Sequence, residues 1–258
     1  MKNNFLLIGR GVVGSAVHQG LGKNNFVAIL DPALGFELAK DLTYDYFDGI
    51  IICLPTPQGP TGECDDFMVE QYMREIRMEA PTVPILIKST ISIELAEFLE
   101  EDENVTYNPE FLTEADSANE FKNQRFAIFG GMTGRFWYYV FVNSDIMIQK
   151  VRFTSMKNAA FAKYAINTFL ATKVVFFNEL QALHKKFKGG EFDSLTDLIS
   201  LDDRIGESHM MVPGPDRKYG FGGMCFPKDT KAFATSAKRA GSRLKLLENV
   251  IEINKEIR

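Results

Sequence analysis

Short apolar runs alternate with segments of helical periodicity over the first half of the chain. Four runs contain no polar residue and stop at a glycine, a proline or a charged residue: residues 5–8, 26–30, 50–54 and 85–87. Continuous apolar runs of this length are typical of parallel strands covered by helices on both faces. Apolar positions recur at helical spacing between and after them, in residues 12–22, 35–40, 66–79 and 92–100. This alternation predicts a doubly wound, mostly parallel α/β sheet.

The pattern changes near residue 154. Three further strands are predicted before that point, at residues 105–107, around 126–129 and at 148–153. Residues 156–187 then contain neither proline nor glycine and carry apolar residues at helical spacing, which predicts one long helix. A short helix at 193–200, a loop rich in proline and glycine at 212–223 and a helical segment at 228–258 follow. We therefore predict a sheet domain at residues 1–153 and an all-helical domain at 154–258.

Composition narrows the class of protein. The chain has 258 residues, 45% of them hydrophobic and 24% charged, which is typical of a globular protein. A net charge of −5 without a basic block argues against a nucleic-acid partner. No segment approaches the roughly 20 apolar residues of a membrane span, so we expect a cytoplasmic protein. Cys53, Cys64 and Cys225 show no paired spacing, and we expect neither a disulfide nor a metal site.

A glycine-rich turn follows the first predicted strand. Gly9-Arg10-Gly11-Val12-Val13-Gly14 has the GxGxxG spacing, and in that position its glycines permit a tight turn, close approach of a pyrophosphate and close packing of helix on strand. Asp31 ends the second predicted strand, where a carboxylate binds a ribose and repels the extra phosphate of NADP. The segment predicts a Rossmann-like NAD site. The alternative is an ordinary glycine turn and an aspartate that caps it.

Two further groups of residues could carry chemistry. The loop Gly220-Phe221-Gly222-Gly223-Met224-Cys225-Phe226-Pro227-Lys228-Asp229 places a thiol just before a predicted helix, and a helix N-terminus with a nearby lysine favours a thiolate nucleophile. Lys163 and Asn167 lie one turn apart on the long helix, where they could stabilise a developing alkoxide. Taken alone, a free cysteine is more often a small buried apolar residue, and a Lys/Asn pair arises by chance.

Several segments together resemble the UDP-glucose/GDP-mannose dehydrogenase family. The matching segments keep the family's order and are Gly9 to Gly14, Pro55-Thr56-Pro57, Lys88-Ser89-Thr90, Asn108 to Leu112, Lys163 to Lys173, Asp203-Arg204-Ile205-Gly206 and Gly220 to Asp229. The resemblance implies NAD as cofactor and oxidation of the C6 hydroxyl of a nucleotide sugar, with UDP-glucose favoured, to a uronic acid. It also implies two NAD reduced per turnover and a place in polysaccharide synthesis.

The resemblance also implies a role for each matching residue. Cys225 would form a thiohemiacetal and then a thioester, Lys163 and Asn167 would stabilise charge on the C6 oxygen, and Asp229 and Thr90 would handle a proton and a water. Glu110 would be the base for thioester hydrolysis, supported by Glu114. The implied cofactor contacts are Gly9, Gly11, Val12, Val13, Gly14, Asp31, Pro55, Thr56, Thr90 and Glu114. The implied substrate contacts are Phe111, Leu112, Lys163, Asn167, Arg204, Phe221 and Gly222.

Three departures and two alternatives accompany the resemblance. Relatives usually continue into a third, UDP-binding domain after a helix that Leu244–Arg258 resembles, and the sequence stops there. Ala160 stands where many members have glutamate, and the loop at 212–218 is longer than in many relatives. We expect a homodimer through the helical domain, with Arg204 reaching the neighbouring subunit. The alternatives are a β-hydroxyacid dehydrogenase, which makes one hydride transfer without a cysteine, and a catalytically impaired NAD-binding dimer.

Overall fold

The computed structural model describes residues 2–39, 42–112 and 116–258. By its internal contacts the chain divides into two compact units. The first consists of Met1–Gly59 and Cys64–Lys163, and the second of Pro60–Glu63 and Tyr164–Arg258. The domain boundary after residue 153 that the sequence suggests stays a prediction.

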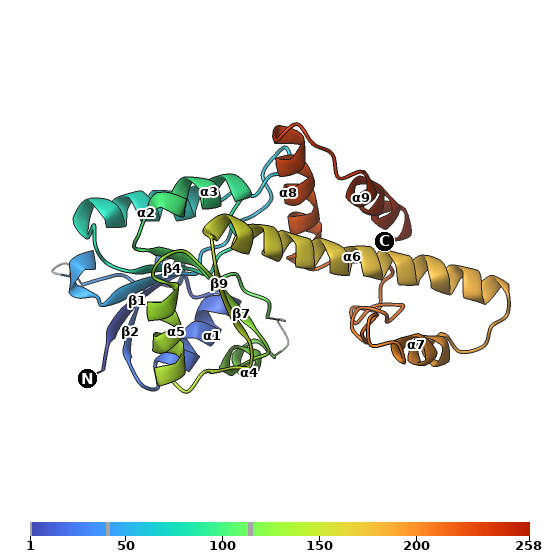
Figure 1. The fold of residues 1–258 in the computed structure, drawn as a ribbon, viewed down its shortest axis with the longest axis horizontal. Helices are drawn as coiled ribbons and strands as arrows, with labels where there is room; N and C mark the ends of the chain where they lie inside the picture. The colour runs from blue at the N-terminus through green and yellow to red at the C-terminus, as the bar shows by residue number, and fades with distance from the viewer. Residues whose placement is uncertain (1, 40–41, 113–115) are drawn as a thin grey trace. The chain divides into compact units, whose positions relative to one another are not determined.

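A seven-stranded sheet organises the described part of the first unit. Its strands are β1 (Asn4–Ile8), β2 (Phe26–Leu30), β3 (Gly49–Ile52), β4 (Ile85–Ile87), β5 (Val105–Tyr107), β7 (Ala127–Gly130) and β9 (Val151–Thr154). They lie in the order β2-β1-β3-β4-β5-β7-β9. Figure 1 labels five of these strands and shows the long helix α6 (Met156–Lys186) of the chain. The first five are parallel, whereas β7 pairs antiparallel with β5 and parallel with β9. Two short strands, β6 (Asn123–Gln124) and β8 (Met147–Ile148), form a separate parallel pair.

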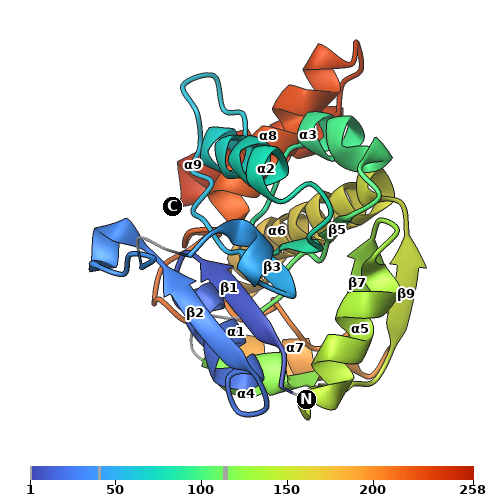
Figure 2. The same cartoon turned by 90° about the vertical axis from the view of Figure 1, so that its left-hand side faces the viewer.

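Alternate residues of the inner strands enter two hydrophobic cores, one on each face of the sheet. Leu6 and Ile8 belong to the core beneath α2 (Phe67–Glu79) and α3 (Ile93–Phe98). Phe5 and Leu7 belong to the core formed with α1 (Val12–Leu21), α4 (Ser117–Lys122) and α5 (Gly134–Asn143). Figure 2 shows α2 and α3 on one side of the strands and α1 and α4 on the other. Burial on both faces explains why the strands are continuously apolar, and the predicted fold class is confirmed.

Some predicted elements of the first unit differ from the observed ones. The helix expected at 35–40 is wrong within the described residues 35–39: a single 3-10 turn, η1 (Pro32–Leu34), is followed by a bridge from Asp31 to Phe36. The strand expected at 148–153 is split between β8 and β9 by a turn. Helix α5 has the sequence GRFWYYVFVN, whose aromatic and β-branched residues favour a strand. Burial of Trp137, Val140 and Phe141 against the sheet overrides that preference.

Helices make up the regular structure described in the second unit. Its larger segment begins within α6 (Met156–Lys186), the predicted long helix. The others are α7 (Phe192–Ser200), α8 (Phe226–Arg239) and α9 (Lys245–Ile257). The helical segment expected at 228–258 is therefore two helices, broken at residues 240–244. Small apolar clusters hold these helices and the intervening loop, one of them formed by Ala171, Val175, Phe221 and Val250. None of the helices described is long and apolar enough to cross a membrane.

Candidate active site

The glycine turn between β1 and α1 is packed so closely that side chains are excluded at two of its positions. Gly9 has a φ of +89°, and a Cβ there would lie 2.6 Å from the carbonyl oxygen of Cys53. A Cβ on Gly14 would lie 2.1 Å from the carbonyl oxygen of Gly9. At Gly11 nothing lies within 4 Å of such a Cβ. The turn is therefore closed on its inner side and open at Gly11, as expected where a pyrophosphate approaches the backbone.

Helix α1 begins within the Gly9–Gly14 segment, with Gly11 as its N-cap. Val12, Val13 and Gly14 form its first turn, where main-chain N–H groups lack partners within the helix and attract anions. Asp31 follows β2, and its Oδ2 accepts a 2.7 Å hydrogen bond from the main-chain N–H of Arg10. The carboxylate proposed to bind the ribose thus also fixes the phosphate-binding turn.

Three polar residues meet at the carboxyl ends of β4 and β5 in the first unit. Lys88 follows β4, and its Nζ lies 2.7 Å from Asn108 Oδ1 and 2.7 Å from Glu110 Oε2. Asn108 follows β5 and donates a 2.7 Å hydrogen bond to the carbonyl oxygen of Ile128 in β7. The end of a parallel sheet is where ligands bind in open α/β folds. The sequence singled out the segment around Lys88 but gave that lysine no role.

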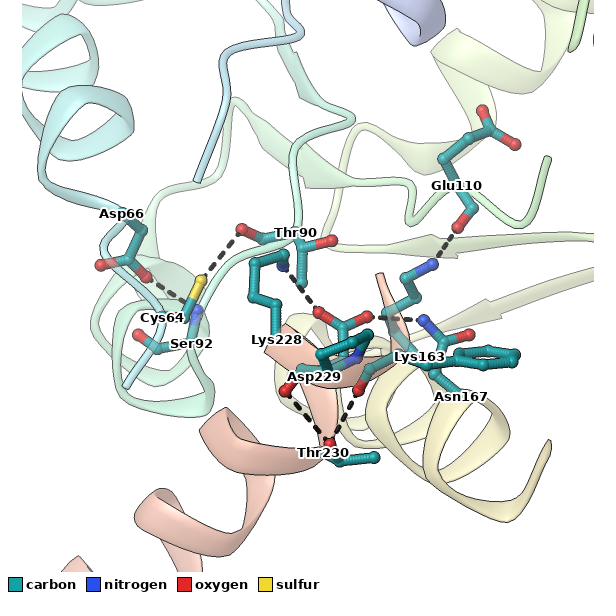
Figure 3. A network of polar contacts seen from close by, with 12 residues as sticks. Cys64, Asp66, Thr90, Ser92, Glu110, Lys163, Asn167, Lys228, Asp229 and Thr230 are labelled. Atoms are coloured by element: carbon teal, nitrogen blue, oxygen red, sulfur yellow. Dashed lines mark hydrogen bonds and ion pairs between the residues drawn. The ribbon is translucent and has the colours of Figure 1, made fainter. Parts of the chain in front are cut away.

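Lys163, in the first part of α6, is directed at the same strand-end segment. It is buried, and its ammonium donates a hydrogen bond to the main-chain carbonyl oxygen of Glu110. Its Nζ also lies 5.0 Å from the centre of the Phe111 ring. Figure 3 shows the carboxylate of Glu110 directed away from Lys163, whose ammonium meets the carbonyl oxygen instead.

The other predicted contacts of the first unit lie in the loops after the strands. Thr56 is buried, Pro55 is exposed and Thr90 is half-buried, with its carbonyl oxygen 3.5 Å from the thiol of Cys64. Leu112 packs at the edge of the core on the α1 face. Glu114 lies outside the described residues. The cofactor and substrate roles of these residues stay predictions.

Cys225 occupies the N-cap position of α8 in the second unit. Its thiol is exposed, it makes no side-chain capping hydrogen bond, and its carbonyl oxygen accepts a 2.8 Å hydrogen bond from the N–H of Asp229. Pro227 stands in the first turn, where its fixed φ favours the start of a helix. The expected position of the thiol before a helix is therefore observed, and the positive end of the helix dipole lies beside it.

Asp229 is a fully buried carboxylate one turn further along α8. Its Oδ1 lies 2.6 Å from Lys228 Nζ, and its Oδ2 accepts a 2.5 Å hydrogen bond from the amide of Asn167 (Figure 3). A buried charge needs such partners because burial otherwise costs several kcal/mol. These contacts orient the amide group of Asn167 and link α6 to α8 within this unit.

The glycine loop before Cys225 is held by two buried asparagines. Asn254 in α9 accepts a 2.7 Å hydrogen bond from the N–H of Phe221 and donates a 3.1 Å bond to its carbonyl oxygen. Asn178 in α6 accepts a 3.0 Å bond from the N–H of Gly220. The ring of Phe221 is buried in the apolar cluster of this unit, and the guanidinium of Arg258 covers Gly222. The sequence analysis missed both asparagines because they are distant along the chain. Asn178 lies 42 residues from Gly220, and Asn254 lies 33 residues from Phe221.

Arg204 does not join these groups in the structure. Its side chain is exposed, and its guanidinium is held by Asp202 through hydrogen bonds of 2.9 and 2.5 Å. The following loop is fixed by Lys173, whose Nζ lies 3.1 and 2.7 Å from the carbonyl oxygens of Ile205 and Gly206. An exposed guanidinium on a fixed loop is compatible with the predicted contact to a second subunit.

The remaining cysteines are chemically different from Cys225. Burial raises the pKa of the Cys53 thiol to about 12, an effect that the nearby Lys88 opposes. Cys53 is therefore protonated at neutral pH, and Cys64 is buried as well. Within the residues that can be described, no three His, Cys, Asp or Glu side chains converge to hold a metal ion.

Comparison with known proteins places these groups in a family context. Residues 18–137 match the NAD binding domain of the UDP-glucose/GDP-mannose dehydrogenase family, and residues 157–256 match its central domain. The chain is 31% identical to the UDP-glucose 6-dehydrogenase TuaD of Bacillus subtilis over 92% of its own length and 55% of the relative's. It is 31% identical to the UDP-glucose 6-dehydrogenase of Rickettsia bellii over 81% of its length and 49% of the relative's. The chain thus spans about half the length of the curated relatives it matches.

Solved structures show the same fold. A UDP-glucose dehydrogenase from the archaeon Pyrobaculum islandicum superposes with a TM-score of 0.82 and 24% identity, covering 99% of this chain and 68% of the other. A 3-hydroxyisobutyrate dehydrogenase from Mycobacterium tuberculosis gives 0.74 and 20% identity, covering 99% and 94%. Fold alone therefore does not separate the two dehydrogenase classes, whereas the sequence matches do. Together the two family matches cover most of the chain and confirm NAD as the predicted cofactor. The chain belongs to the UDP-glucose/GDP-mannose dehydrogenase family.

Proposed function

We propose that the protein oxidises the C6 hydroxyl of a nucleotide sugar, UDP-glucose in the first instance, to the carboxylate with NAD as oxidant. The observation that carries this proposal is Cys225, an exposed thiol at the N-cap of α8. One turn later lies the buried Asp229, whose carboxylate contacts both Asn167 and Lys228. A single oxidation of an alcohol needs no nucleophile, whereas conversion of an aldehyde to an acid gains from a covalent intermediate. The cysteine therefore favours a four-electron oxidation over a single hydride transfer.

The proposed reaction has four steps. Hydride loss from C6 gives an aldehyde and one NADH, and the sulfur of Cys225 then adds to the aldehyde carbon to form a thiohemiacetal. Loss of a second hydride to a second NAD gives a thioester. Water then breaks the carbon–sulfur bond, which releases the carboxylate and returns the thiol. The turn from Gly9 to Gly14 and Asp31 would hold NAD, which would supply the oxidant for both oxidation steps.

The other roles follow from the chemistry of each group. The ammonium of Lys163 and the amide of Asn167 would stabilise negative charge on the C6 oxygen. Asp229, which already orients Asn167, would exchange protons with this pair and with a water near Thr90. Glu110 would remove a proton from the water that attacks the thioester. The sugar would be contacted by Phe111, Leu112, Phe221 and Gly222. The cytoplasmic location expected from the sequence also stays a prediction.

A test of the proposed reaction is identification of the product. The protein is incubated with NAD and UDP-glucose, and in parallel with GDP-mannose and UDP-N-acetylmannosamine, and the nucleotide products are identified by mass spectrometry. We expect UDP-glucuronate from UDP-glucose and little product from the other sugars. Aldehyde as the final product would contradict the role of Cys225. If only another sugar nucleotide gives an acid, the proposed four-electron oxidation is supported and UDP-glucose is not the substrate.

We also propose that the helical unit forms a homodimer. Phe169, Phe176 and Leu183 recur every seven residues along α6 with 69%, 57% and 52% of their surfaces exposed. Apolar residues at this spacing form one stripe on a helix, and an exposed stripe of large apolar residues marks an interaction surface. We expect a dimer by light scattering at micromolar concentration, and a Phe169→Glu/Phe176→Glu double variant should be monomeric. A monomeric wild-type protein would contradict the dimer.

A further inference from the structure

Lys88 is a buried cation at the centre of the strand-end cluster. Its side chain is only 1% exposed, and its ammonium lies 2.7 Å from each of two oxygens, Asn108 Oδ1 and Glu110 Oε2. The rings of Phe121 and Phe141 lie 5.5 and 5.8 Å from Nζ and supply apolar and cation–π contacts. An ammonium removed from water this completely requires a compensating anion. Glu110 is the carboxylate that supplies it.

Glu110 is in turn fixed at three points. Its side chain is 13% exposed, with Oε2 on Lys88 and Oε1 accepting a 2.9 Å hydrogen bond from the N–H of Phe111. Its carbonyl oxygen accepts a hydrogen bond from the ammonium of Lys163. The two lysines therefore hold different ends of one residue: Lys163 the main chain and Lys88 the carboxylate. Figure 3 shows that the side chain turns away from Lys163, so that lysine does not set the direction of the carboxylate.

A general base must be ionised and must be held in one direction. The Lys88 ammonium, 2.7 Å from one oxygen of the Glu110 carboxylate, holds that side chain in one direction. From this geometry we infer that Lys88 is a positioning residue that holds the Glu110 carboxylate for thioester hydrolysis. The inference rests on the role proposed for Glu110. Lys88 also links β4 to β5 through Asn108, so a test must separate positioning from simple stabilisation of the sheet.

Replacement of Lys88 by methionine removes the charge and keeps a chain of similar length. If Lys88 positions the hydrolytic base, Lys88→Met should leave the first NADH of a single turnover within about threefold of wild type and slow steady-state turnover by about 100-fold. Sugar acid should accumulate as a thioester on Cys225, which mass spectrometry of the quenched protein detects. Glu110→Gln should give the same pattern, and the double variant should be no slower than either single one. Equal slowing of both phases, without thioester, would overturn the inference.

Lys157→Met provides the matched control. Lys157 also pairs with a carboxylate, Glu97, at 2.6 Å, but both side chains are largely exposed. Turnover and covalent occupancy of Cys225 should be unchanged in this variant. If Lys88→Met does not fold, Lys88→Gln, which keeps a hydrogen-bond donor without the charge, is measured in its place.

A second measurement is independent of turnover. Because Glu110 Oε1 accepts the N–H of Phe111, the NMR signal and hydrogen exchange of that amide report where the carboxylate lies. In Lys88→Met the Phe111 amide should shift upfield and exchange about tenfold faster, since loss of one hydrogen bond is worth about one factor of ten. An unchanged Phe111 amide in a folded variant would refute positioning by Lys88. If wild type makes no NADH while this amide responds, the proposed function fails and the positioning of Glu110 stands.

Discussion

Cys225→Ala is expected to abolish formation of the sugar acid and of the second NADH while leaving the fold and NAD binding intact. The thiol is exposed and makes no side-chain capping bond, so its loss should change the free energy of unfolding by less than about 0.5 kcal/mol. Removing the nucleophile of a covalent mechanism costs on the order of 10³-fold or more in turnover. Turnover is measured by NADH absorbance, stability by thermal unfolding and NAD affinity by calorimetry.

The matched control for that variant lies one residue earlier. Met224 is 76% exposed in the same loop, and Met224→Ala should retain turnover within about twofold, as exposed residues outside a site usually do. A wild-type protein that forms only one NADH per sugar, at a rate that Cys225→Ala does not change, would show that the reaction needs no thiol. The β-hydroxyacid dehydrogenase type of chemistry, with one hydride transfer, would then be favoured.

Two glycines of the phosphate-binding turn should respond differently to alanine. Because a Cβ at Gly14 would lie 2.1 Å from the carbonyl oxygen of Gly9, Gly14→Ala must displace backbone and should cost about 3 kcal/mol or more of stability. The displaced turn should also weaken NAD binding at least tenfold, or about 1.4 kcal/mol. Thermal unfolding and calorimetric titration with NAD measure the two effects.

Gly11→Ala separates binding from stability. No atom lies within 4 Å of a Cβ at Gly11, so the free protein should lose less than about 1 kcal/mol. The added methyl group would nevertheless occupy the open side of the turn, where the pyrophosphate is proposed to approach. We expect near-wild-type melting with clearly weaker NAD binding. Unchanged NAD affinity in both variants would show that the cofactor does not bind at this turn.

Periodicity predicted most of the fold because the inner strands of the parallel region, β1, β3, β4 and β5, are buried on two faces. Such strands must be continuously apolar, and glycine, proline or charged residues mark their ends. Helix α5 could not be predicted in this way, since GRFWYYVFVN has strand-favouring residues and becomes helical only through packing of Trp137 and Phe141 on the sheet. The helix expected at 35–40 shows the converse within the described residues 35–39: the sequence permits a helix, but the bridge between Asp31 and Phe36 turns the chain back.

The candidate site was predictable where chemistry follows a local signal. Three features could be placed because each directly adjoins a predicted strand or helix in the sequence: the turn from Gly9 to Gly14, the strand-end residues and the thiol before α8. Contacts between residues far apart in the sequence could not be predicted in this way. The pairing of Lys88 with Glu110 depends on two strand ends becoming neighbours, and the asparagine that binds Phe221 comes from a helix 33 residues away.

If Cys225 supports a four-electron oxidation, two NADH must form for each molecule of sugar that is oxidised. The protein is given excess NAD and a limiting, known amount of UDP-glucose, and NADH is followed to completion. We expect two NADH for each UDP-glucose consumed by the wild type, and no more than one with Cys225→Ala. A ratio of one in the wild type would contradict the four-electron oxidation.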